Sequence, residues 1–180
     1  MAAAIALPVP TVVALLVPAA AADSTRLVAH VVVVGRAGVT DGDTIRMSSA
    51  LVTSEGTTKE LTGVRIRLFG IDAPEKNQTC LKMMKEWSCG QDASRAMAAI
   101  IRGKEVTCYV RDTDRFKRLV AVCSVSGIPD INAEMVKQGY AVAYRKYSMD
   151  YVDEEETARK AGAGLWASEF DMPWNYRHTS

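Results

Sequence analysis

Histidine is nearly absent from this 180-residue sequence, and neither sign of charge prevails. Its two histidines, His30 and His178, lie far apart, and no Gly-x-Ser-x-Gly segment occurs, so the pattern of serine hydrolases is missing. No glycine-rich stretch ends in Gly-Lys-Ser/Thr, which excludes the phosphate loop of nucleotide-binding proteins. The formal net charge of +1 excludes binding of a polyanion by bulk charge, so any such ligand requires a local basic patch.

Residues 1–22 contain no ionisable side chain. Pro8, Pro10 and Pro18 interrupt this apolar run, which leaves a short apolar centre over 12–17 followed by small residues. A helix that spans a bilayer needs about 20 apolar residues and tolerates fewer prolines. Although no lysine or arginine precedes the apolar centre, we predict a cleaved secretory signal rather than a retained anchor.

Residues 23–180 have the length and apolar content of one ordinary globular domain. The sequence has 48% hydrophobic residues, and it contains no internal repeat and no linker that would separate a second domain. We expect the mature protein to be secreted or periplasmic, monomeric, and without stable membrane insertion once the signal is cleaved.

The four cysteines are spaced as two local pairs. No Cys-x-x-Cys spacing is present, so a four-cysteine zinc site is not predicted. Cys80 and Cys89 flank the segment that leads into a predicted helix, while Cys108 and Cys123 are symmetric about a charged turn and would face each other in an antiparallel hairpin. We therefore predict the two local disulfides, each stabilising the fold by roughly 2–4 kcal/mol, in agreement with export.

Apolar periodicity predicts several strands and a few helices. Val64 to Leu68 alternates strictly, so apolar side chains occupy one face of a strand and arginines occupy the other. Apolar spacing, terminal residues and charge order predict helices over 93–101, 132–138 and 153–160. The acidic run Asp153 to Glu156 is interpreted as a solvated helix face rather than a metal site. The polar segment Ser48 to Thr62 is predicted to be a loop extension, which costs little stability.

Carboxylates gather in two predicted turns. In the segment 68–75 an apolar run ends at Gly70, and Asp72 and Glu75 then stand on either side of Pro74, so a rigid turn presents acids at a sheet edge. Upstream, the turn Thr40-Asp41-Gly42-Asp43-Thr44 supplies two more, although a lone Asp-Gly-Asp is usually a hairpin turn. Carboxylates from two separate turns favour a hard, oxygen-seeking cation such as calcium.

Arginines stand at the ends of two predicted strands. Arg67 lies five residues before Asp72, and Arg118 closes the charged turn that begins at Asp114. A guanidinium group suits a phosphate because its fork donates two parallel hydrogen bonds to the phosphate oxygens. Carboxylates for a cation, a further glutamate at position 75 that the cation does not need, and two arginines for a phosphate together indicate hydrolysis of a phosphodiester.

The order of these motifs resembles the staphylococcal nuclease (thermonuclease) family. Asp-Gly-Asp-Thr, Arg-x-x-x-x-Asp-x-Pro-Glu, Asp-Arg-Phe-x-Arg and Leu-Trp follow one another between roughly Val39 and Trp166. The resemblance implies an α+β, mainly β fold, in which a five-stranded OB-type barrel carries three helices. It also implies calcium-dependent hydrolysis of single-stranded or double-stranded DNA and RNA to products that carry a 3′ phosphate.

The resemblance assigns roles to the acidic turns residue by residue. Asp43, Asp72 and the backbone carbonyl of Ala73 would hold the calcium ion. Because the ligand at position 73 is a carbonyl, alanine in place of the threonine often found there need not harm the site. Glu75 would orient or deprotonate the attacking water, which requires it to lie within hydrogen-bond reach of that water.

The resemblance assigns Arg67 and Arg118 to the scissile phosphate. Lys117 stands where the family usually has glycine, and Phe116 replaces the usual tyrosine. If position 117 needs a positive φ angle, lysine costs on the order of 1 kcal/mol or more and could swing Arg118 aside. The charge of Lys117 could equally tighten substrate binding.

Tyrosines interleave with cations just after the second predicted helix. Tyr144 and Tyr147 flank Arg145 and Lys146, and aromatic rings beside cations suit a nucleobase stacked over a phosphate. Tyrosines also commonly cap a core, and the spacing to Tyr147 is one residue longer than in the family.

The rival hypothesis is an OB-type binding module in the exported compartment that holds nucleic acid or a protein without cutting it. Relatives inside larger proteins have lost their site residues, whereas all five are present here, which favours the enzyme. They are Asp43, Arg67, Asp72, Glu75 and Arg118.

Overall fold

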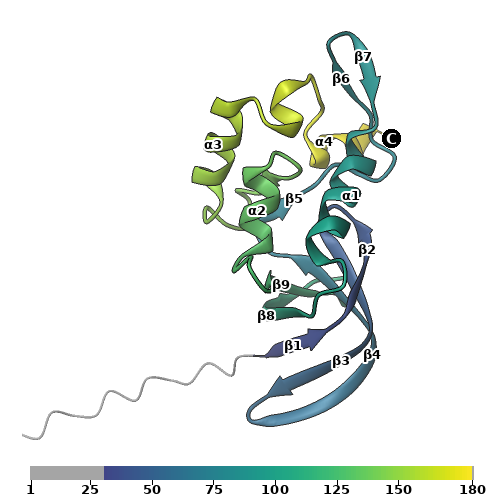
Figure 1. Cartoon of the computed structure of the whole chain (residues 1–180), viewed down its shortest axis with the longest axis vertical. Coiled ribbons are helices and arrows are strands. Elements are labelled where there is room, and N and C mark those ends of the chain that lie inside the picture. The colour runs from purple at the N-terminus through teal and green to yellow at the C-terminus, as the bar shows by residue number, and fades with distance from the viewer. Residues whose placement is uncertain (1–30, 180) are drawn as a thin grey trace, which may run out of the picture.

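The computed structural model describes residues 31–179 (Figure 1). The predicted signal over 1–22 lies outside the described residues, so its cleavage stays a prediction. Among residues 31–179, no helix has both the length and the apolar character needed to cross a bilayer.

Five strands close into a barrel in the order β1–β8–β9–β4–β3, because β1 pairs with both β8 and β3. A further strand, β2, pairs with the first half of β3. The pairing of β4 with β9 is parallel and the others are antiparallel. The strands are β1 (Val32–Gly35), β2 (Ala37–Asp41), β3 (Thr44–Ser54), β4 (Thr57–Leu68), β8 (Val106–Thr113) and β9 (Leu119–Ser124). The barrel confirms the predicted α+β, mainly β OB-type fold.

The alternation of apolar residues and arginines in Val64 to Leu68 places the two kinds of side chain on opposite faces of β4, as expected. Ile66 and Leu68 point into the barrel and are buried, whereas Arg65 is exposed and Arg67 lies at the rim. Each large apolar side chain buried in this way stabilises the fold by about 1.5–3 kcal/mol. The barrel core therefore fixes which face of β4 the arginines occupy.

The prediction of a loop over Ser48 to Thr62 is wrong. β3 and β4 continue through this segment as paired strands and meet at a two-residue turn, Glu55-Gly56, with φ angles of 51° and 75°. The segment was misread because its side chains are polar. A hairpin that is largely exposed on its β4 side needs no apolar alternation, and threonine favours extended backbone.

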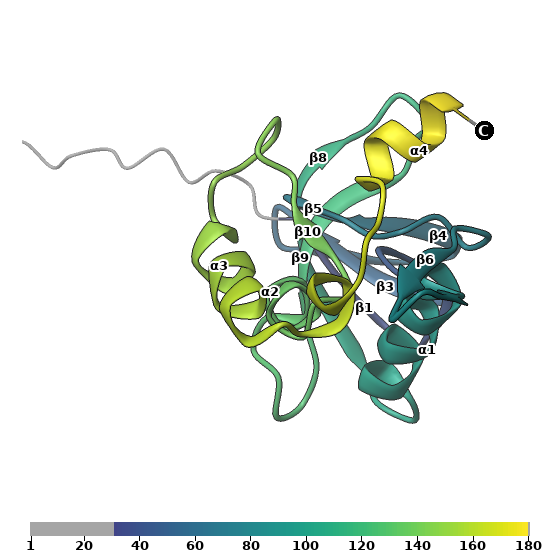
Figure 2. The same ribbon diagram turned by 90° about the horizontal axis from the view of Figure 1, so that it is seen from above.

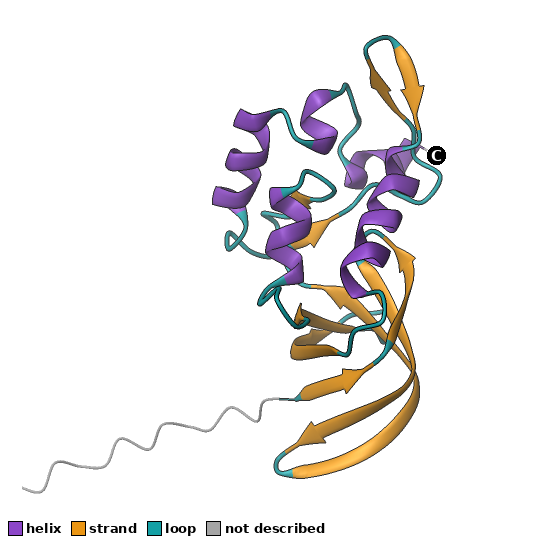
Figure 3. Cartoon of the chain, viewed as in Figure 1, coloured by secondary structure: helices purple, strands orange, loops and turns teal. Residues whose placement is uncertain are grey.

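The helices gather at one end of the barrel, away from the β3–β4 turn (Figure 3). The three predicted helices are present as α1 (Cys89–Ile101), α2 (Ile131–Lys137) and α3 (Val152–Ala161). Seen from above, α2 and α3 lie on one side and α1 on the other (Figure 2). Two short helices follow that were not predicted, η1 (Gly164–Ala167) and α4 (Pro173–Thr179).

Both predicted disulfides are present. Cys108 and Cys123 face each other across β8 and β9, and Cys80–Cys89 closes the base of a small hairpin formed by β6 (Cys80–Lys82) and β7 (Lys85–Trp87). The Cys80–Cys89 disulfide belongs to an apolar cluster outside the barrel core. Its members are Cys80, Cys89, Val142 and Leu165, with Trp87, Trp166, Phe170, Met172 and Trp174 packed against them.

Candidate active site

The two acidic turns meet because glycine allows close approach at Gly42. A Cβ atom there would lie 2.7 Å from the Cβ of Ala73 and 2.8 Å from that of Ala93 on α1. The backbone of Asp43 is held in turn, since its carbonyl accepts from Leu68 N at 2.8 Å. The packing of this turn on α1 thus brings the second aspartate of Asp-Gly-Asp beside the Asp72 turn.

Asp43 lies buried between the two turns. Its Oδ2 accepts a hydrogen bond of 2.7 Å from Ala73 N, and its Oδ1 accepts from Arg67 Nη1 and from Thr44 Oγ1. Burial raises the pKa of Asp43 to about 6, because the loss of hydration outweighs the attraction of Arg67. Asp43 is therefore a carboxylate at neutral pH and takes up a proton in mild acid.

Asp72 is fully buried on the short strand β5 (Ile71–Asp72), which pairs with β10 (Val142–Ala143). Arg67 Nη2 donates to Asp72 Oδ1 at 2.6 Å while Arg67 Nη1 contacts Asp43, so one guanidinium joins both carboxylates. Burial alone would lower the pKa of Arg67, but the two aspartates more than offset this and the net shift is upward. Arg67 stays charged.

Glu75 lies at the edge of this cluster, with a side chain 35% exposed. Its carbonyl lies against the start of α1, where a Cβ atom at Gly90 would come within 1.7 Å of that oxygen. The side chain of Gln78, which is buried, accepts a hydrogen bond of 3.2 Å from Glu75 N. Two contacts therefore fix the backbone of the predicted water-activating residue.

Arg118 reaches the same corner from the β8–β9 turn. Its Nε donates to Asp114 Oδ2 at 2.7 Å, and its Nη1 lies 3.5 Å from Thr44 Oγ1, next to Asp43. The neighbouring Lys117 has a φ of 59°, so the position does require the left-handed region. Asp114 nevertheless holds Arg118 toward the cluster, and Lys117 itself is exposed at the turn.

The predicted base-stacking tyrosines lie together, but one ring face is covered. Tyr144 stacks on Trp174 of α4, with centroids 5.2 Å apart and planes 5° apart, and Tyr147 meets Tyr144 edge-on at 4.9 Å. Arg145 forms an ion pair of 2.6 Å with Glu155. The interpretation of the acidic run as a wholly solvated face is wrong, because Glu155 is buried and also accepts from Ala143 N.

The donor atoms suit a hard cation, although among the described residues no three acidic, histidine or cysteine side chains form a metal-binding group. Asp43 and Asp72 offer carboxylate oxygens, and Ala73 supplies a backbone carbonyl in the turn between Asp72 and Glu75. Two carboxylates and a carbonyl are oxygen donors of the kind that calcium takes. Both carboxylates are also paired with Arg67, so part of their negative charge is already offset by that guanidinium.

Residues 65–168 match the model of a family described as staphylococcal nuclease homologue. The chain belongs to the staphylococcal nuclease family. The match begins after Asp43 and ends before α4. The contacts of Asp43 with Arg67 and Ala73 are therefore what join the first acidic turn of this nuclease homologue to the matched region.

The relatives include proteins named as endonucleases. An uncharacterized endonuclease of Escherichia coli is 32% identical over 143 residues, which cover 78% of this chain and 81% of that protein. An uncharacterized endonuclease of Haemophilus influenzae is 35% identical over 131 residues, which cover 72% of this chain and 63% of that protein. The succinoglycan biosynthesis protein ExoI of Rhizobium meliloti is 30% identical over 140 residues, covering 76% and 66%. The chain thus spans less than two thirds of the last two proteins.

Sequence reasoning missed three residues that contact the site of this nuclease homologue. Arg177 of α4 binds Asp72 and Glu75, Trp174 stacks on Tyr144, and Gln78 donates from Nε2 to the carbonyl of Asp171 at 2.7 Å. Proline at the first position of a helix was an available signal for α4. The separation of 105 residues between Asp72 and Arg177 gave no signal at all.

Proposed function

We propose that this nuclease homologue is an exported, calcium-dependent enzyme that hydrolyses phosphodiester bonds of DNA and RNA and leaves 3′ phosphates. One observation carries the proposal. The predicted site residues form a continuous chain of contacts at one corner of the barrel, from Arg118 through Thr44 and Asp43 to Arg67 and Asp72. Two disulfides and the predicted signal support export, and we expect a monomer.

We assign Asp43, Asp72 and the carbonyl of Ala73 to calcium. Bound there, the ion would offset negative charge on the phosphate as water attacks. Arg67, which is partly buried between the two carboxylates and stays charged, forms an ion pair with each of them. The burial of both aspartates also keeps water from competing for their oxygens.

We assign the remaining steps to three side chains. Glu75 would orient the attacking water and take its proton, for which its partial exposure leaves room. Arg67 and Arg118 would donate to the phosphate oxygens on which charge builds as the bond to the 5′ oxygen breaks. Lys117, Tyr144 and Tyr147 would contact the rest of the nucleic acid, where Tyr147 is 64% exposed.

The purified protein is expected to degrade DNA and RNA when calcium is present and to stop when a chelator is added, because the assigned aspartates hold the ion. The fragments should carry phosphate at the 3′ end, which a phosphatase would release. Cleavage that persists in excess chelator would remove the calcium assignment. Oligonucleotide binding without any nicking of plasmid DNA would favour the non-catalytic binding module.

Calcium affinity is expected to weaken as the pH falls through about 6, because a proton then competes with the ion for Asp43. Folding stability should show the opposite slope. Between pH 3.8 and about pH 6, Asp43 holds a proton in the folded chain but not in the unfolded chain. The contribution of Asp43 to the free energy of unfolding therefore falls as the pH rises through that window. Calcium titrations and urea unfolding across the window measure both. An unfolding profile that Asp43→Asn leaves unchanged would contradict the assignment.

A further inference from the structure

Arg177 of α4 occupies the acidic end of the site. Its Nη2 donates to Asp72 Oδ2 at 2.7 Å, and its Nη1 donates to Asp72 Oδ1 at 3.1 Å and to Glu75 Oε1 at 2.7 Å. Such a two-pronged pair is the strongest geometry that arginine and a carboxylate form. Arg67 reaches Asp72 only at Oδ1, so Oδ2 is held from the side of Arg177.

Trp174 fixes this arginine in place. Residues three apart on a helix share a face, so the stack of Trp174 on Tyr144 and the contacts of Arg177 belong to one surface of α4. The segment before α4 is anchored as well, because Leu81 and Glu169 exchange two backbone hydrogen bonds and Gln78 holds the carbonyl of Asp171. The helix thus covers the assigned metal ligand and the assigned base-stacking ring together.

We propose that Arg177 competes with the divalent cation for Asp72 and so sets the ion concentration at which the site loads, with Trp174 as the anchor that maintains this competition. This inference rests on the proposed metal site.

The competition follows from the atoms that the two cations need. Asp72 is fully buried, so its carboxylate cannot turn toward solvent to offer a free oxygen. An ion binds carboxylate oxygens at about 2.3–2.6 Å, which is the space that the guanidinium nitrogens of Arg177 occupy. Like charges at that separation repel strongly in a buried site. The ion therefore has to displace Arg177 from Asp72.

Displacement would have a second consequence for Glu75. The same Nη1 atom of Arg177 binds both Asp72 and Glu75, so its departure from one oxygen also loosens the other. Ion loading would then release Glu75 for the attacking water. Departure of α4 would also expose the face of Tyr144 that Trp174 covers.

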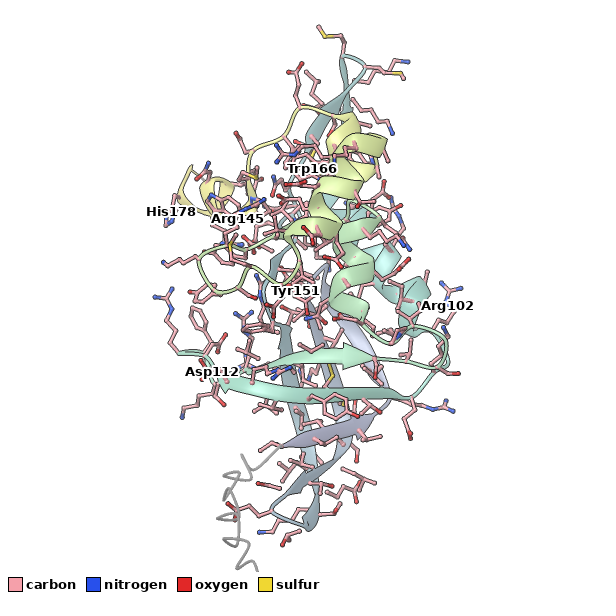
Figure 4. All side chains as sticks on the ribbon, turned by 90° about the vertical axis from the view of Figure 1, so that its left-hand side faces the viewer. Arg102, Asp112, Arg145, Tyr151, Trp166 and His178 are labelled. Atoms are coloured by element: carbon pink, nitrogen blue, oxygen red, sulfur yellow. A yellow bond between two sulfur atoms is a disulfide. The ribbon has the colours of Figure 1, made fainter. Side chains whose placement is uncertain are left out.

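Ion titrations on three forms of the full chain test the competition. Arg177→Gln is expected to bind calcium, and terbium followed by its luminescence, about tenfold more tightly than the unsubstituted protein. Arg177→Lys keeps the positive charge but loses the two-pronged guanidinium contact. Its affinity for the ion should therefore lie between that of the unsubstituted protein and that of Arg177→Gln. Arg102→Gln is the matched control, because it removes the same charge from an exposed position on the opposite side of the molecule from His178 (Figure 4).

Trp174→Ala should also tighten ion binding, since it frees the same helix. If α4 acts as one unit, the double variant Trp174→Ala/Arg177→Gln binds the ion no more tightly than Arg177→Gln alone. Additive gains in the double variant would overturn the anchoring role of Trp174. These measurements are made without nucleic acid and need no catalytic activity.

Hydrogen exchange distinguishes displacement from a lasting contact. Calcium is expected to speed amide exchange in α4 of the unsubstituted protein and to have no further effect in Arg177→Gln, where exchange is already fast. Slower exchange in α4 with calcium, or equal ion affinity in Arg177→Gln and the unsubstituted protein, would overturn the competition. Failure of every form to bind the ion would instead overturn the metal site on which the proposed function rests.

Discussion

Glu75→Gln is expected to slow phosphodiester cleavage by roughly 100-fold to 10,000-fold, the usual worth of a general base. The amide keeps the size of the side chain and can still accept from Arg177 Nη1, but it cannot take a proton from water. The loss should therefore appear in kcat, measured by single-turnover digestion of an oligonucleotide at saturating protein. Binding of the oligonucleotide in chelator should remain unchanged.

Glu156→Gln is the matched control for this substitution. Glu156→Gln also removes one negative charge, but from α3. The side chain of Glu156 is 57% exposed there, and its ion pair with Lys160 spans 3.9 Å. Turnover by this variant should equal that of the unsubstituted protein. A near-normal rate in Glu75→Gln would show that another group activates the water.

Arg118→Ala is expected to lower turnover by roughly 100-fold to 1,000-fold, as the loss of one transition-state donor does elsewhere. Asp114 holds the guanidinium of Arg118 toward Thr44, so the group is oriented before substrate arrives. The effect should again fall on kcat more than on KM, because the charge on the phosphate oxygens grows in the transition state. Initial rates over a range of substrate concentrations separate the two constants.

The same turn supplies the control. Arg115→Ala removes an exposed guanidinium that lies over the Phe116 ring, three residues from Arg118. It should change turnover little, apart from weaker binding at low salt that reflects a lost surface charge. Equal losses in Arg115→Ala and Arg118→Ala would mean that the turn acts only through its net charge. A normal rate in Arg118→Ala would mean that Lys117 grips the phosphate instead.

Much of the barrel could be predicted because its determinants are local. A strand with one buried face repeats every two residues, and Val64 to Leu68 shows that repeat without interruption. The cysteines at 108 and 123 are symmetric about a charged turn, and hairpin geometry then places them opposite each other. Such patterns need only short stretches of chain and simple geometry.

Prediction failed where the environment of a residue depends on distant segments. The polar residues of Ser48 to Thr62 gave no alternation, yet β3 pairs there with β1 and β4. Glu155 sits in an acidic run that would be solvated on an isolated helix, but in the fold it is buried, accepts a hydrogen bond from Ala143 N and pairs with Arg145. Neither contact leaves a trace in the local pattern of residue types.

The order of residues in this nuclease homologue was enough to predict which acids and arginines form the candidate site and to suggest phosphodiester chemistry, because side-chain type limits which ligands a group can bind. Folding alone determined that Arg67 joins Asp43 to Asp72 and that Arg177 lies across Asp72 and Glu75. The contact of α4 with the site depends on the packing of an apolar cluster around Cys80–Cys89, on a stacked pair of rings and on one buried glutamine. Gln78 and Asp171 are 93 residues apart in the sequence and Asp72 and Arg177 are 105 apart, and contacts at that range arise only when the whole chain packs.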